Sequence, residues 1–115
     1  MFKSVEYAGF EDNPELQQAV ERVTPVIASM LRDWAKNVAV EWLACPDNPV
    51  GAELTLRLEL PTAEGSASRI LTLEELTNPT RFEERCRSIW LRSLDEYFER
   101  RKPAWDEIIN QPAEV

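Results

Sequence analysis

The side chains that most often perform catalysis or hold metal ions are absent or scattered in this sequence. It contains no histidine, which removes the commonest general base and the commonest zinc ligand. Without histidine, Cys45 and Cys86 can form neither a Cys–His nucleophile pair nor a usual structural zinc site. We therefore expect both cysteines to be buried free thiols that pack as small apolar groups.

Carboxylates are plentiful, but their spacing does not favour a catalytic pair. Acidic neighbours occur at 11–12, 74–75 and 83–84, and adjacent residues on a helix do not face each other. Three glycines in the whole chain are too few for a glycine-rich phosphate loop or a dinucleotide fingerprint. We expect no catalytic, cofactor-binding or metal-binding residues, no cofactor and no enzymatic activity. Spacing leaves open whether distant carboxylates converge on a metal ion.

The composition limits the classes of partner. The 115 residues include 21 acidic and 13 basic side chains, which gives a net charge of −8. Nucleic acid and anionic membranes repel a chain of this sign, so neither is an expected partner. The sequence shows no membrane-spanning stretch and no secretory signal. We expect a cytoplasmic protein with one α+β domain over residues 1–110 and a frayed tail over 111–115.

Hydrophobic spacing predicts the strands of the sheet. Residues 52–60 alternate apolar and polar side chains, the pattern of a strand with one buried face. We expect further strands at 2–8, 38–45 and 68–73. The short turns that follow residues 45 and 60 imply antiparallel neighbours. A ladder of four leucines on one strand requires helices to cover it: Leu54, Leu56, Leu58 and Leu60.

The first helix is expected to begin at the Asn13-Pro14 pair, where asparagine caps the helix and proline loses no needed hydrogen bond. Its apolar stripe reaches Trp34 and stays in phase across Pro25. The stripe therefore predicts a kinked but continuous helix that ends at Asn37.

The second helix is expected to begin at Asn78-Pro79 and to reach about Lys102, where Pro103 stops it. A short C-terminal helix follows in this prediction. Apolar residues at helical spacing are assigned to the inner side of the long helix: Phe82, Cys86, Ile89, Trp90, Leu94, Tyr97 and Phe98.

Together these elements predict a β-α-β-β-β-α order, with two long helices on one face of an antiparallel sheet and a short C-terminal helix, an α+β two-layer sandwich. Over residues 2–102 this order resembles the ribosome-hibernation-factor fold, and its α-β-β-β-α core is similar to a double-stranded RNA-binding domain. The resemblance lies in element order and carries over no functional residues. It implies a ribosome- or RNA-associated factor, which would need one basic strip made of Arg81, Arg85, Arg92, Arg100, Arg101 and Lys102.

The function that we expect is non-catalytic protein–protein interaction, with a homodimer as one form. Its basis is a set of apolar side chains that fall off the main stripes, so the candidate protein-contact residues are Leu43, Leu91, Trp105, Ile108 and Ile109. Burial of the C-terminal segment against the body is the alternative for the last three. The sequence identifies neither partner nor process.

An acidic inhibitor or immunity-type protein that binds a basic nuclease or nucleic-acid-binding partner is the hypothesis from another class. It requires one continuous acidic face formed by Glu11, Asp12, Glu15, Glu21, Glu53 and Glu59.

Overall fold

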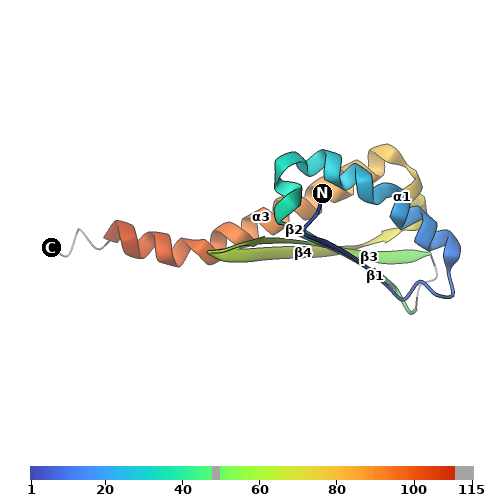
Figure 1. Cartoon of the computed structure of the whole chain (residues 1–115), viewed down its shortest axis with the longest axis horizontal. Helices are drawn as coiled ribbons and strands as arrows, with labels where there is room; N and C mark the ends of the chain where they lie inside the picture. Colours follow the sequence, from blue (N-terminus) through green and yellow to red (C-terminus); the bar gives the residue numbers. More distant parts are fainter. Residues whose placement is uncertain (48–49, 111–115) are drawn as a thin grey trace.

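The computed structural model describes residues 1–47 and 50–110, with side chains through residue 100, as a mixed α/β fold (Figure 1). Helices α1, η1 and α3 lie on the same side of a four-stranded sheet (Figure 1). The elements, in chain order, are β1 (Ser4–Ala8), α1 (Pro14–Leu31), the 3₁₀ helix η1 (Arg32–Asn37), β2 (Val38–Ala44), β3 (Gly51–Leu60), β4 (Ala63–Thr72), α2 (Leu73–Thr77) and α3 (Pro79–Asn110).

The sheet has the strand order β1-β2-β3-β4 and is mostly antiparallel. Pairs β2–β3 and β3–β4 are antiparallel, as the short turns predict. The expectation of a wholly antiparallel sheet is wrong, because β1 and β2 are parallel. The chain between them passes over the sheet as α1 and η1, and a helical crossover returns a strand in the same direction.

The leucine ladder of β3 faces the helices, as its alternation predicts. Leu54, Leu56 and Leu58 are each fully buried, whereas Leu60 at the end of the strand is only partly buried. The register places Leu54 beside Trp42 of β2, which is also buried. The helix-covered face of the central strands therefore forms the core.

Helix α1 begins as predicted and ends earlier than predicted. The side chain of Asn13 accepts a hydrogen bond from the Leu16 N–H at 3.2 Å, and the helix continues through Pro25. The expected continuous α-helix to Asn37 is wrong in its last part. Arg32 has a φ of 54° and separates α1 from η1, so the apolar stripe loses its phase there.

Close contact at Gly65 fixes α3 on the sheet. A Cβ at this position would lie 2.7 Å from the Tyr97 Cα and still closer to the Tyr97 N and Ser93 O. The hydroxyl of the buried Ser93 donates a hydrogen bond to the carbonyl oxygen of Leu56 at 2.8 Å. Strand β4 starts five residues before the expected strand at 68–73, and the glycine in that added part is what lets α3 approach.

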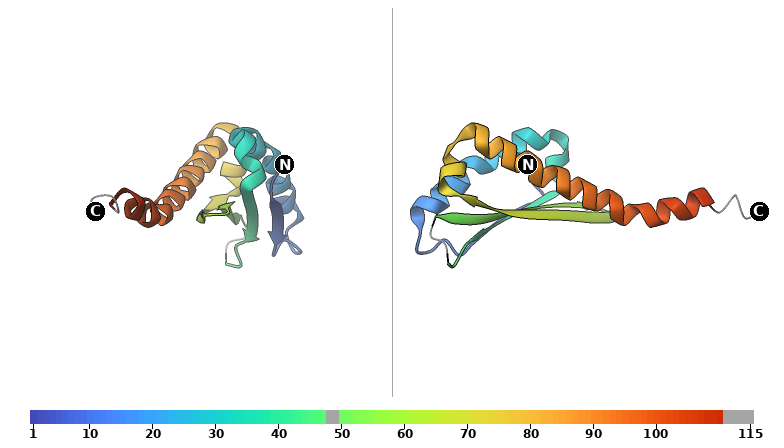
Figure 2. Two further views of the ribbon diagram at one scale, coloured as in Figure 1. Left: turned by 60° about the vertical axis from the view of Figure 1, so that its left-hand side comes forward. Right: turned by 180° about the vertical axis from the view of Figure 1, so that it is seen from behind.

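The C-terminal part of the chain forms one helix instead of two. Helix α3 continues to Asn110, so the expected stop at Pro103 and the separate short helix are wrong. Proline removes one main-chain hydrogen bond, which kinks or weakens a helix without always ending it. Figures 1 and 2 show the last turns of α3 standing beyond the end of the sheet. A helical turn over 74–77, which the sequence allows, is present as α2, whereas the separate 3₁₀ helix η1 is missing from the predicted order.

Candidate protein-contact surface

One side of α3 exposes large apolar side chains. Leu91 is 53% exposed and Phe98 is 55% exposed, while Trp90 and Leu94 are partly buried against the core. At 100° per residue these four positions fall within one arc of about 100° on the helix. We call this surface the α3 flank.

Trp34 of η1 extends the α3 flank toward the neighbouring helix. Its ring centroid lies 6.2 Å from that of Trp90, at an interplanar angle of 59°, and the side chain is 44% exposed. Tilted aromatic pairs of this kind attract each other, so the two indoles form a firm edge to the surface.

The sequence assigned Trp34 and Phe98 to inner stripes, and both assignments are wrong. Trp34 lies after the break at Arg32, where 3₁₀ winding changes the direction of each side chain. Phe98 follows Tyr97, which is buried, and adjacent positions on a helix point 100° apart. That adjacency was a usable signal in the sequence, because only one of the two rings could face the sheet.

Leu43, another predicted contact residue, lies away from the α3 flank. The register aligns Leu43, Glu53 and Ile70 in one row on the sheet face opposite the buried Trp42 and Leu54. Leu43 is 47% exposed and Ile70 is 52% exposed, and both line a shallow hollow of about 300 Å³. The structure therefore separates Leu43 from Leu91 and pairs it with Ile70, which the sequence analysis missed.

The remaining predicted contact residues are Trp105, Ile108 and Ile109, and their side chains lie outside the described part of the structure. The predicted tail at 111–115 also lies outside it.

Charge is distributed unevenly between α3 and the rest of the chain. Residues 1–79 contain thirteen acidic and six basic side chains, whereas residues 79–100 of α3 contain five of each. Two of the arginines in the basic strip that an RNA-associated factor would need form ion pairs. Arg85 pairs with Glu75 at 2.6 Å, and Arg100 pairs with Glu96 at 2.7 Å. The α3 flank thus lies on an electrically balanced element of an acidic protein.

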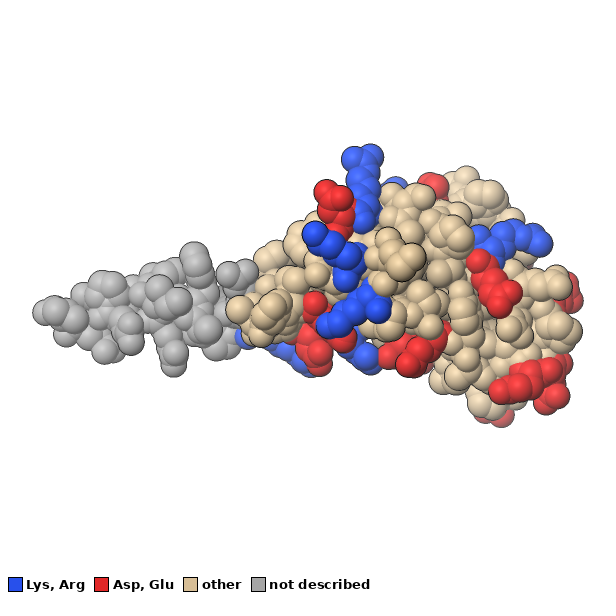
Figure 3. All heavy atoms as spheres, viewed as in Figure 1, with Lys and Arg blue, Asp and Glu red and all other residues tan. Residues whose placement is uncertain are grey.

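Acidic side chains gather at the end of the molecule where β1 leads into α1 (Figure 3). The register puts Glu53 at this end, in the row of Ala8 and Leu43. Glu59 lies six residues farther along β3 and is 3.8 Å from the Lys3 Nζ. Glu53 and Glu59, two of the six carboxylates named for an acidic face, therefore lie at opposite ends of β3.

Both cysteines are free, Cys86 buried and Cys45 partly exposed. Burial raises the pKa of the Cys86 thiol to about 12. Burial, with Glu53 and Asp47 nearby, also raises the pKa of Cys45. Since the thiolate is the reactive form, the surroundings of each cysteine oppose nucleophilic chemistry.

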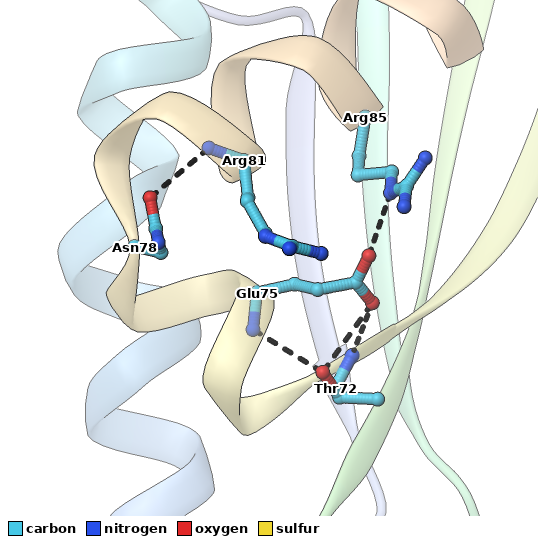
Figure 4. A network of polar contacts seen from close by, with 5 residues as sticks. All are labelled: Thr72, Glu75, Asn78, Arg81 and Arg85. Atoms are coloured by element: carbon cyan, nitrogen blue, oxygen red, sulfur yellow. Dashed lines mark hydrogen bonds and ion pairs between the residues drawn. The ribbon is translucent and has the colours of Figure 1, made fainter.

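A polar network joins the end of β4 to α2 and α3 (Figure 4). Thr72 and Glu75 form a capping box, in which the Thr72 hydroxyl accepts from the Glu75 N–H at 3.2 Å. Arg85 donates from Nε to the Glu75 carboxylate at 2.6 Å. Asn78 accepts from the Arg81 N–H at 3.2 Å, the cap that the Asn-Pro pair predicts. These contacts fix the corner between α2 and α3, so we interpret the network as structural.

Burial alone would raise the pKa of Glu75, but hydrogen bonds from Thr72 and Arg85, together with the charge of Arg85, outweigh it and lower the pKa. Glu75→Gln keeps the capping box and loses the ion pair. We expect a loss of roughly 0.5–1 kcal/mol in unfolding free energy at pH 7. The native pKa lies below the unfolded value, so the difference is fully present above about pH 4.3 and declines as pH falls through the native pKa.

Urea denaturation from pH 7 to pH 3 measures this difference. Glu74→Gln, at an exposed neighbouring position, is the matched control and should change stability little at any pH. If the difference in unfolding free energy between Glu75→Gln and the parent protein stays constant down to pH 3, the carboxylate charge does not stabilise the corner between α2 and α3.

Two further kinds of feature do not occur in the described part of the chain. No three Cys, Asp or Glu side chains there come together as a metal-binding group. No helix within residues 1–47 and 50–110 is long and apolar enough to cross a membrane. Comparisons with protein-family models, with curated proteins and with solved structures find no match for this chain.

Proposed function

We propose that this protein is a non-catalytic protein–protein interaction domain and that the α3 flank is its contact surface. The observation that carries the proposal is the exposure of more than half of both Leu91 and Phe98, joined by the partly buried Trp90 and Leu94. Exposed apolar patches on soluble proteins often mark sites of protein contact, and aromatic side chains are enriched where proteins meet.

The spacing of the flank indicates the shape of the partner. Leu91, Leu94 and Phe98 are three and then four residues apart, the alternation of a seam between two helices. A partner helix, or a groove that accepts a helix, fits this spacing. The acidic end of the molecule supports a second candidate, a basic partner held by charge (Figure 3). Measuring partner binding at increasing salt concentration distinguishes the two candidates, because charge-driven binding weakens with added salt whereas apolar contact does not.

The proposed function is tested by affinity capture from the native host with three forms of the whole chain as bait. Leu91→Lys with Phe98→Lys should reduce the amount of any specific partner, including the untagged chain itself, at least tenfold, because it places two charges in an apolar contact. The matched control is Glu83→Gln with Glu84→Gln, which changes net charge equally at exposed positions of the same helix, before the flank begins. Equal capture by all three baits would contradict the proposal.

A further inference from the structure

We infer that the partner of the α3 flank is a second copy of this chain, with the two α3 helices paired antiparallel about a two-fold axis. The inference rests on the proposed function and specifies its partner. It follows from the position of the α3 extension, residues 98–110, from the spacing of apolar residues along α3, and from the distribution of charge.

The α3 extension stands outside the body of the protein. The Tyr97 Oη lies 3.4 Å from the Thr62 Oγ1 in the turn between β3 and β4, so α3 has reached the end of the sheet at this residue. Thirteen more helical residues follow, and Figure 1 shows them beyond the sheet. In proteins most of the stability of a helix comes from tertiary packing of an amphipathic face rather than from helix propensity. Packing against another surface would supply the missing stability.

The sequence repeats the spacing of the flank along the extension. Trp105 lies seven residues after Phe98, and Ile108 lies three residues after Trp105. Leu91, Phe98 and Trp105 thus recur every seven residues, and Leu94 and Ile108 keep the second position of the same repeat, which Arg101 occupies between them. In an antiparallel pair with its centre near residues 98–101, the extension of each copy lies along the flank of the other. One symmetric contact then covers both regions in both copies.

The balance of acidic and basic side chains on α3 favours this helix as the contact between two copies of an acidic protein. Each copy has a net charge of −8, which opposes association at most faces. Residues 79–110 of α3 carry seven acids and seven bases, so contact along this helix adds no net like-charge repulsion.

Sedimentation equilibrium of the purified whole chain tests the inference. We expect a dimer at micromolar concentration and at least a tenfold rise in its dissociation constant in Leu91→Lys with Phe98→Lys. The Glu83→Gln with Glu84→Gln control, near the start of α3 and far from this centre, should remain dimeric. A second variant, Trp105→Lys with Ile108→Lys, acts beyond the sheet and should give the same loss with the circular dichroism of the body unchanged.

Small-angle scattering tests the direction of pairing. Antiparallel overlap along α3 makes the dimer longer than the 62 Å of one copy, whereas parallel pairing leaves the length near that value. A dimer near 62 Å, a dimer insensitive to both lysine variants, or a monomer at millimolar concentration would overturn the inference. A monomer that still captures another protein through Leu91 and Phe98 would leave the proposed function standing.

Discussion

Gly65→Val should destabilise the protein by about 3 kcal/mol or more, the largest effect that we expect from one added side chain. The atoms in the way belong to the main chain of α3 at Ser93 and Tyr97, and main chain cannot rotate aside as the end of a side chain can. Either α3 moves away from β4 or the strand bends, and both responses loosen the buried contacts around Ser93. Urea denaturation followed by circular dichroism measures the loss.

Ser66→Val is the matched control for Gly65. It adds the same side chain to the next residue of β4, which the strand alternation directs to the open face. Its stability should stay within about 0.5 kcal/mol of the parent protein. Gly65→Ala should fall between the two valine variants. A Gly65→Ala protein as stable as the parent would show that α3 does not lie this close to β4.

Trp42→Ala should cost about 3–5 kcal/mol, the range for removal of a large aromatic side chain from a core. Trp42 is 1% exposed and lies opposite Leu54. Its indole N–H also donates to the Thr24 Oγ1 at 3.1 Å, and Thr24 donates in turn to the Val20 carbonyl at 2.7 Å. Alanine leaves both a cavity and a hydroxyl without this donor.

Chemical denaturation of three variants separates these contributions. Trp42→Phe keeps much of the volume and loses the N–H, so it should cost less than Trp42→Ala. Leu43→Ala, the next residue on the exposed face, should change stability by no more than about 0.5 kcal/mol. Equal losses for Trp42→Ala and Leu43→Ala would contradict the assignment of the two faces.

Local patterns predicted the parts of the fold that depend on local chemistry. The alternation of β3 identified the buried Leu54, Leu56 and Leu58, and the asparagines at 13 and 78 cap their helices as expected. The direction of β1 depends on a crossover rather than on its own residues, and the start of β4 depends on α3 packing over Gly65. Neither leaves an alternating pattern in the sequence.

The contact surface was harder to predict than the core. Leu91 was singled out because it falls off the buried stripe, and the structure exposes it. Phe98 and Trp34 were missed because an apolar residue at helical spacing is by default assigned to the core. Their exposure arises from where the sheet ends and where η1 begins, and both are features of the whole fold.

The parallel pairing of β1 with β2 makes β1 the strand whose detachment from the sheet should require the least free energy. All five residues of β1 are exposed, and within residues 1–47 and 50–110 β1 is an edge strand that pairs only with β2. Strands β2, β3 and β4 are joined by short turns and share the core, so they can persist as a unit while β1 opens. Local unfolding in this protein should therefore begin at β1, with its amide protons exchanging well before those of the leucine ladder.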